Sequence, residues 1–274
     1  MASLLKPSGV DAPDHALGQY RAWKIADGPE APADLAWISA AGAGAPCAHR
    51  LLPHGEPSLA LLRRRTLDGE VSELRVVVCG PYYKAKQYRP SPREELIAVR
   101  LKPEVSAALF GIAPADYSNA AIANAPPVLT DACARTLRLG ETADAFSVLD
   151  ALKDDVQRFT QGRAFKNGPE SRAAETMRKT EGRIRLREIA GALGVSERHL
   201  RRRFADHVGC APKAYARYLQ ITAAALAAER HAAPDWANIA AGAGFHDQAH
   251  MINAFKAETG LTPTAFHAER RALL

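Results

Sequence analysis

The sequence predicts an α+β protein with a β-rich first half and an all-α second half. Short branched or apolar runs separated by turn residues fill the first 140 positions. From Thr142 onward, apolar residues recur at helical spacing. Within the second half, two segments resemble each other, which indicates a duplicated structural unit.

Length and composition are those of a soluble globular protein with one large or two moderate domains. The chain has 274 residues, of which 47% are apolar and 24% charged. No apolar run approaches the roughly 20 residues of a membrane span, and the amino-terminal segment lacks the pattern of a secretory signal. Four widely spaced cysteines without a CxxC pair argue against a zinc site and a disulfide framework. We therefore expect a cytoplasmic protein with no membrane partner.

Positive charge concentrates in the second half of the chain. The net charge is +6, with 16 Lys/Arg and 17 Asp/Glu in residues 1–150. Residues 151–274 hold the other 20 Lys/Arg and 13 Asp/Glu, a net charge of +7. This asymmetry suggests a polyanionic partner for the second half, and a solvated basic face is the alternative.

The first half contains the signals of short antiparallel strands. Segments Pro57–Thr66, Val71–Cys79 and Glu95–Leu101 are apolar or branched runs bounded by Gly, Pro, Asp and Ser. Pro103–Phe110 is expected to form a short helix, with Pro near its start and Gly just past its end. Residues 112–140 are rich in Ala and Pro and give no clear assignment.

Helical periodicity begins at about Thr142 and continues to Gly162, with an apolar stripe of Phe146, Leu149, Leu152, Val156 and Phe159. The polar, Gly- and Pro-containing segment Thr160–Arg172 is the candidate linker. It separates a β-rich sensor or dimerisation domain, residues 15–160, from a helical domain, residues 169–271. Helices are expected in the second domain at 171–180, 186–193, 197–207, 212–231, 235–243, 247–259 and 262–270.

The repeated segments are IAGALGVSERHLRRRF, Ile189–Phe204, and IAAGAGFHDQAHMINAF, Ile239–Phe255. Each has the layout of a helix-turn-helix: a short helix, a tight turn at glycine, and a second helix that buries an apolar pair. The buried pairs are Leu200/Phe204 and Met251/Phe255. Small residues at Ala190, Ala192, Ala240 and Gly242 would let the helices approach closely. Ser196 and Asp247 are expected to cap the second helices.

One long helix, from Pro212 to about His231, is predicted between the two units, with an inward stripe of Tyr215, Leu219, Thr222 and Leu226. A helix of this length spans about 30 Å. One turn of B-DNA is about 34–36 Å long. The helix could therefore hold two recognition helices in successive major grooves.

The second half resembles the DNA-binding domain of the AraC/XylS family of bacterial transcription regulators, over about Pro169–Arg271. The resemblance rests on LREIAGALGVSERHLRRRF, APKAYARYLQ and GFHDQAHMINAFKAETGLTPTAF, and on Gly-x-x-Pro at Gly209–Pro212 and Gly260–Pro263. It implies a double helix-turn-helix domain that binds promoter DNA and often contacts RNA polymerase.

The first half resembles, more weakly, the sensor-like domain of some AraC-type proteins, a β-rich module for which a cupin-like fold is one candidate. The segments that carry this resemblance are His49–Leu62 and Gly80–Gly111. His54 departs from the family pattern, which has an acidic residue there, so any function of that loop in the family does not transfer directly. The resemblance leaves a small-molecule effector and homodimer formation as open roles of this domain.

The exposed faces of the two recognition helices hold the candidate base contacts. They are Arg198, Arg201 and Arg202 in the first helix, and Gln248, Ala249, Ile252 and Asn253 in the second. The arginines match family positions that reach base edges and suit guanine, with phosphate contact as the alternative. The second set is uncharged and suits A·T pairs, and docking of this helix through its backbone is the alternative. The family often has Arg in place of Asn253. Candidate phosphate contacts are Arg203, His199, Lys213, Arg217 and Lys256. The alternatives are a packing role for Arg203 and His199, and a solvated surface charge for the others.

No other group of residues predicts chemistry of its own. His49, His54 and Glu56 lack the HxH pair of a cupin metal site, so no metal is predicted. Tyr82, Tyr83 and Tyr88 suit sheet packing better than a pocket. No catalytic residue and no cofactor are predicted.

The leading hypothesis is a sequence-specific transcription regulator, not an enzyme, whose first domain senses a signal or mediates assembly. A cupin-like enzyme fused to a DNA-binding domain, and a constitutive DNA binder, are the alternatives.

Overall fold

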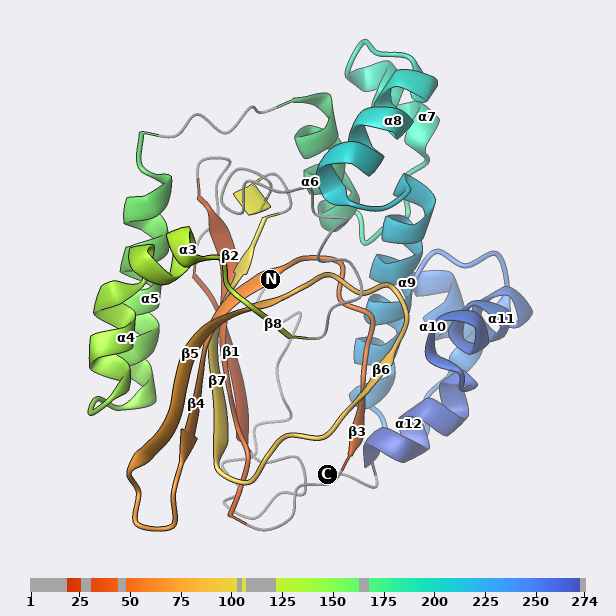
Figure 1. The fold of residues 1–274 in the computed structure, drawn as a ribbon. Coiled ribbons are helices and arrows are strands. Elements are labelled where there is room, and N and C mark those ends of the chain that lie inside the picture. Colours follow the sequence, from red (N-terminus) through yellow and green to blue (C-terminus); the bar gives the residue numbers. More distant parts are fainter. Residues whose placement is uncertain are drawn as a thin grey trace.

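The computed structural model describes residues 19–25, 31–43, 48–102, 105–106, 122–162 and 168–271. The expected fold class is confirmed: an antiparallel sheet forms the first part and helices form the second (Figure 1). The helices between residues 127 and 160 cover the sheet on one side, and the carboxy-terminal helices lie on the other (Figure 1). Among the described residues, no helix has the length and apolar character needed to cross a membrane.

The main sheet has six strands in the order β1-β2-β7-β4-β5-β8, and every neighbouring pair is antiparallel. The strands are β1 (Gln19–Lys24), β2 (Ala33–Ala40), β4 (Ser58–Arg65), β5 (Val71–Cys79), β7 (Glu94–Leu101) and β8 (Ala123–Asn124). The three expected strands are confirmed as β4, β5 and β7. The sequence did not predict β1 and β2. Burial in β2 does not alternate strictly, so the two-residue period that marks a half-buried strand is weak there.

A separate two-stranded ribbon is formed by β3 (His49–Leu51) and β6 (Lys86–Tyr88). Its strands are antiparallel, with Arg50 opposite Gln87. The ribbon lies beside the carboxy-terminal helices (Figure 1). It was not predicted, because a three-residue strand is too short to show a hydrophobic period.

The two faces of the main sheet bury different clusters of side chains. Leu59, Leu61 and Ile97 belong to the cluster that packs against α3 (Pro127–Ala132), α4 (Ala134–Gly140) and α5 (Ala145–Thr160). Ala60, Leu62 and Ala98 belong to a second cluster on the opposite face, with Trp37 and Tyr88. This alternation follows from the two-residue period of a strand.

The expected helix at about 142–162 is confirmed as α5. Of the predicted stripe, Leu149, Leu152 and Val156 are buried, whereas Phe159 is half-buried and Phe146 is exposed. The Asp144 side chain caps the amino terminus of the helix. The unassigned residues 112–140 include α3 and α4. Of the expected helix Pro103–Phe110, Val105 and Ser106 are helical, and the rest lies outside the described residues.

The carboxy-terminal part is all α-helical, as expected. Its helices are α6 (Pro169–Lys179), α7 (Leu186–Ala192), α8 (Glu197–Val208), α9 (Pro212–Glu229), α10 (Trp236–Gly242), α11 (Gln248–Thr259) and α12 (Pro263–Arg271). The predicted linker was too long at both ends: α5 includes Thr160, and Pro169 begins α6. Proline suits a first helical turn because the N–H it lacks would have no partner there.

Two details of packing were predicted wrongly. In the predicted inward stripe of α9, Tyr215 is buried as expected, but Leu219, Thr222 and Leu226 are only half-buried. The other buried residues of this helix are Pro212, Tyr218, Ile221, Ala224, Ala225 and Ala228. Ala-rich sequences offer several plausible apolar faces, and tertiary contacts select one. Of the small residues expected between the helices, Ala190 and Ala240 are buried, whereas Ala192 and Gly242 are exposed.

Candidate nucleic-acid interface

The helical part contains two units built alike. In the first, α7 and α8 are joined through Gly194 at φ 67°, and in the second, α10 and α11 are joined through Gly244 at φ 78°. These positive φ angles favour glycine, which has no Cβ to clash. The Ser196 hydroxyl accepts a hydrogen bond from the His199 N–H at 3.2 Å. The sequence expectation of a duplicated unit with glycine turns is therefore confirmed.

The second cap is also as expected, because the Asp247 carboxylate accepts from the His250 N–H at 2.7 Å. The predicted apolar pairs are fully buried: Leu200 and Phe204 in α8, Met251 and Phe255 in α11. The second helix of each unit therefore has one face buried in a core and the opposite face exposed to solvent.

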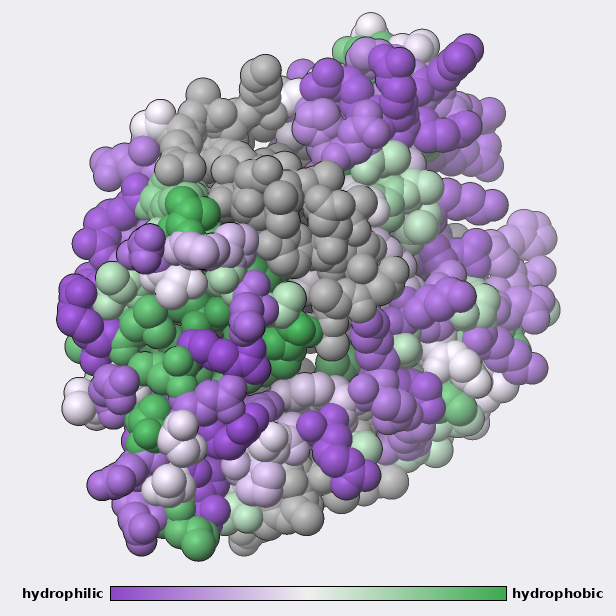
Figure 2. All heavy atoms as spheres, in the orientation of Figure 1, coloured by the Kyte–Doolittle hydropathy of each residue, from purple (hydrophilic) through white to green (hydrophobic). Residues whose placement is uncertain are grey.

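The outer face of α8 is cationic. Arg198, His199, Arg201 and Arg202 are all exposed, and Figure 2 shows hydrophilic residues dominating the surface over α7 and α8. Arg201 forms an ion pair with Glu197 one turn earlier. The structure thus brings the three predicted arginines to one surface. Among them, Arg201 is already paired with an acidic side chain.

The outer face of α11 is polar but uncharged over its first two turns. Gln248, Ala249 and Asn253 are exposed, and Ile252 is half-buried. Lys256 lies exposed toward the end of the same helix. The exposed face of α8 is therefore positively charged, whereas the equivalent face of α11 is uncharged over its first two turns.

Arg203 is held differently from the other arginines of α8. Its guanidinium donates two hydrogen bonds to the buried carboxylate of Glu170 in α6, at 2.7 and 2.9 Å. Burial would raise the pKa of Glu170, but the hydrogen bond from Arg203 and the nearby His207 outweigh it, and the pKa lies below its usual value. A phosphate would have to compete with Glu170 for this guanidinium.

The remaining predicted phosphate contacts lie on α9. Lys213 is exposed in its first turn. Arg217 is half-buried, with its guanidinium 5.9 Å from the centre of the Phe245 ring. Arg217 therefore also links the connecting helix to the turn of the second unit.

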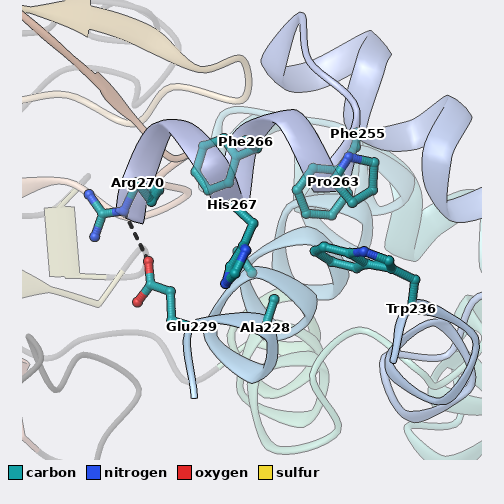
Figure 3. Close-up of a pocket in the computed structure, with 9 residues that line it drawn as sticks. Ala228, Glu229, Trp236, Phe255, Pro263, Phe266, His267 and Arg270 are labelled. Atoms are coloured by element: carbon teal, nitrogen blue, oxygen red, sulfur yellow. Dashed lines mark hydrogen bonds and ion pairs between the residues drawn. The ribbon is translucent and has the colours of Figure 1, made fainter. Parts of the chain in front are cut away.

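The second unit is anchored to α9 by α12. Figure 3 shows Trp236, Phe255, Phe266 and His267 around a narrow apolar space beside Ala228. Two polar contacts close its rim. Arg270 pairs with Glu229 at 3.0 Å, and His267 lies 3.1 Å from the carbonyl oxygen of His231. These contacts fix the second unit relative to the connecting helix.

A buried polar junction between the sheet domain and α9 was not predicted from the sequence. The carboxylate of Glu56 accepts hydrogen bonds from Tyr215 at 2.5 Å and from Tyr218 at 2.8 Å. Arg100 lies 3.8 Å from the same carboxylate and forms a two-bond pair with Asp34, at 2.7 and 2.8 Å. The only available signal was a pair of tyrosines three positions apart on one helix face.

The charges at this junction shift one another's pKa values. Burial would raise the pKa of Glu56, but Arg100, Arg178 and His54 outweigh it, and the pKa is lowered. Burial lowers the pKa of His54 to about 4. Burial and the Glu56 carboxylate raise the pKa of Tyr218 far above its usual value. At neutral pH the junction therefore holds an anionic Glu56, a neutral His54 and protonated tyrosines.

Comparison with known proteins agrees with the geometry. Residues 189–269 match the sequence profile of a family described as a helix-turn-helix domain, which is of the AraC type. No curated protein sequence matches the chain.

Among solved structures, ToxT from Vibrio cholerae O395 has 8% identity and a TM-score of 0.43, covering 92% of this chain and 97% of that one. Unsaturated-fatty-acid-bound wild-type ToxT from Vibrio cholerae strain SCE256 has 11% identity and a TM-score of 0.41, covering 90% and 93%.

The duplicated units and the matching profile define a DNA-binding transcription regulator. Its carboxy-terminal part is an AraC-type helix-turn-helix domain.

Proposed function

We propose that the protein is a sequence-specific regulator that places α8 and α11 in successive major grooves on one face of promoter DNA. The observation that carries the proposal is the pair of equivalent units with their outer faces exposed, joined by one helix. α9 has 18 residues and is therefore about 27 Å long. This length is close to the roughly 34–36 Å repeat of B-DNA.

The residues proposed to read bases are Arg198, Arg201 and Arg202 in one groove, and Gln248, Ala249, Ile252 and Asn253 in the other. Arginine can donate two hydrogen bonds to guanine, while Gln and Asn can pair with adenine. We therefore propose a G-containing half-site for α8 and an A·T-richer half-site for α11.

Backbone contacts supply much of the affinity. We propose His199, Lys213 and Lys256 as phosphate contacts because each is exposed. Arg203 and Arg217 remain weaker candidates, since each already has a partner within the protein.

We further propose residues 15–160 as the domain that senses a small-molecule effector or mediates assembly, and 169–271 as the DNA-binding domain. The Glu56 junction supports a regulatory role for the first domain, because it joins the sheet domain to α9, the helix between the two units. RNA polymerase and a second copy of the chain are the further partners proposed.

Binding-site selection on randomised duplex DNA with the full-length protein tests the proposal. The expected result is a motif of two segments about 10 bp apart, centre to centre, on one face of the duplex. The variants Arg202→Ala and Asn253→Ala should each change a different segment. A single short segment, or no enrichment, would contradict docking in two grooves.

A further inference from the structure

The two segments 49–56 and 82–88, here called the junction ribbon, run antiparallel and pair at two places. Strands β3 and β6 pair through His49–Leu51 and Lys86–Tyr88. The pairing extends to His54 and Tyr82, whose backbone N–H and C=O groups exchange two hydrogen bonds of 2.7 Å. Two short hydrogen-bonded stretches, with residues 52–53 and 83–85 between them, therefore hold the two segments side by side.

One end of the ribbon holds the second helix-turn-helix unit. Arg50 Nη1 donates to the carbonyl oxygen of Thr259 at 2.9 Å, and its Nε pairs with Glu269 of α12 at 3.2 Å. The Ala85 N–H donates to the carbonyl oxygen of Glu258 at 2.6 Å. Leu52 packs against the apolar core of this unit.

The other end of the ribbon holds the first unit and the connecting helix. Tyr83 packs against the core of the first unit, and its hydroxyl lies 3.5 Å from the carbonyl oxygen of Val208. Gly55 approaches α9 so closely that an added Cβ would lie 2.5 Å from the Tyr218 ring. Glu56 completes this contact by accepting the hydroxyl hydrogen bonds of Tyr215 and Tyr218.

The carbonyl groups that the ribbon binds have one property in common. Val208 is the last residue of α8, and Glu258 and Thr259 are the last two residues of α11. The last carbonyls of a helix lack partners within the helix and carry partial negative charge, so N–H and O–H donors and the cationic guanidinium stabilise them. The ribbon therefore contacts the carboxy-terminal ends of both recognition helices, at equivalent positions of the two units.

We propose that the junction ribbon fixes the separation of the two recognition helices and so determines which half-site spacing the protein accepts, with Arg50 as the main positioning residue. This inference rests on the proposed docking in two grooves. Along the chain α9 and its flanking turns join the units, and Arg183, which precedes α7, contacts the carbonyl oxygen of Gly242 at 3.4 Å. The ribbon adds a connection from the other domain. Each added connection restricts the relative movement of the two units, and a restricted pair of helices binds well only to matching DNA.

The test compares DNA affinities across a spacing series. The DNA is the site selected by the full-length protein, with the distance between the two segments shortened or lengthened by one or two base pairs. The full-length proteins are the wild type, Arg50→Ala, Arg50→Lys and Arg75→Ala. Arg75 is the matched control because it lies on β5 and its contacts, with Glu73 and Asn124, are within the sheet domain. Thermal unfolding of each variant checks that it is folded.

Wild type and Arg75→Ala are expected to prefer one spacing sharply. Arg50→Ala should lose about three- to tenfold affinity at that spacing and less at the others, so that the preference flattens. Arg50→Lys, which keeps the charge but not the two-pronged contact, should be intermediate.

Three results would separate the possibilities. If Arg50→Ala loses DNA affinity equally at every spacing, so that the spacing preference is unchanged, the inference is overturned and the proposed function still stands. Higher DNA affinity of Arg50→Ala at every spacing would also overturn the inference and would show that the ribbon inhibits DNA binding. A wild type without any spacing preference would contradict docking in two grooves itself.

Discussion

Tyr218 donates its hydroxyl to the Glu56 carboxylate across 2.8 Å, joining the connecting helix to a loop 162 positions earlier in the chain. Tyr215 donates to the other oxygen of the same carboxylate, and Arg100 lies beside it. The contact between the two domains is therefore centred on a buried charge with several partners. Removing one partner leaves the others buried and unsatisfied, which makes such a junction sensitive to single substitutions.

Glu56→Gln is expected to lower the free energy of unfolding by about 1–3 kcal/mol, because the tyrosines and Arg100 lose a charged acceptor. Tyr218→Phe should lower it by about 1–2 kcal/mol. Urea unfolding of both variants and of the double variant measures these changes. The double variant should lose less than the sum of the two, since Glu56→Gln weakens the same hydrogen bond that Tyr218→Phe removes. Asp150→Asn, in an exposed ion pair with Lys153, is the control and should change little.

Stability should fall as the pH drops from about 6.5 toward 4, the window set by His54. The unfolded chain protonates this histidine near its usual pKa, while the folded protein keeps it neutral to about pH 4. The unfolded state therefore binds more protons in this window, and stability is lost on acidification. Urea unfolding at several pH values should show that the free energy of unfolding depends less steeply on pH in His54→Gln than in the wild type. His246 is highly exposed and serves as the control. An equally reduced pH dependence in His246→Gln would contradict the assignment of this window to His54.

A separate loss of stability is expected at lower pH. The pKa values of Glu56 and Asp34 are both lowered, so their contribution persists at neutral pH and disappears only as the pH falls through those lowered values.

Arg202→Ala is expected to relax sequence choice in one half-site, at a cost of about 1–3 kcal/mol in binding free energy. The reason is that an exposed arginine on the outer face of α8 can discriminate guanine from the other bases. Titration against a set of single-base variants of the selected site measures the effect. A uniform loss across all variants would instead identify Arg202 as a phosphate contact.

Lys213→Ala should reduce the slope of log affinity against log salt by about one, because one phosphate contact is lost. Arg203→Ala should leave that slope unchanged, since Glu170 holds its guanidinium. It should instead lower the free energy of unfolding by about 1–3 kcal/mol by removing the partner of a buried carboxylate. Binding titrations at several salt concentrations, with unfolding curves for both variants, check this pair. Equal slopes in wild type and Lys213→Ala would show that Lys213 does not touch phosphate.

Gly182→Ala should destabilise the protein by more than about 2 kcal/mol. Gly182 has φ 76°, and an added Cβ would lie 2.3 Å from the carbonyl oxygen of Ala216 in α9. Gly69 has a similar φ of 86° but open space around it. Gly69→Ala is therefore the control, with an expected cost of about 1–2 kcal/mol from backbone strain alone. Chemical unfolding that gives the two variants equal losses would contradict the role of the close approach.

The sequence could predict features that depend on neighbouring residues. The glycines at the turns, the caps Ser196 and Asp247, and the buried pair Leu200 and Phe204 lie within one short segment each, so their spacing alone carries the information. The duplication strengthened each of these expectations, because the same pattern occurs twice.

Features that depend on distant residues could not be predicted. Nothing near Glu56 indicates that its partners are Tyr215 and Tyr218, and nothing near Arg50 indicates Thr259. The buried face of α9 was mispredicted for the same reason. Its Ala-rich sequence allows more than one apolar face, and the helices of the two units packed around it decide between them.

Under the proposed docking, the difference between the outer faces of α8 and α11 gives the bound protein a direction. Three arginines occupy one face, and the equivalent face has none among its predicted base contacts. An operator read by one chain therefore need not be palindromic, and it has a left and a right end. Inverting such an operator would turn the whole molecule around and carry the sheet domain to the opposite side. The position of the regulator relative to a transcription start would then depend on the orientation of its site as well as on its distance.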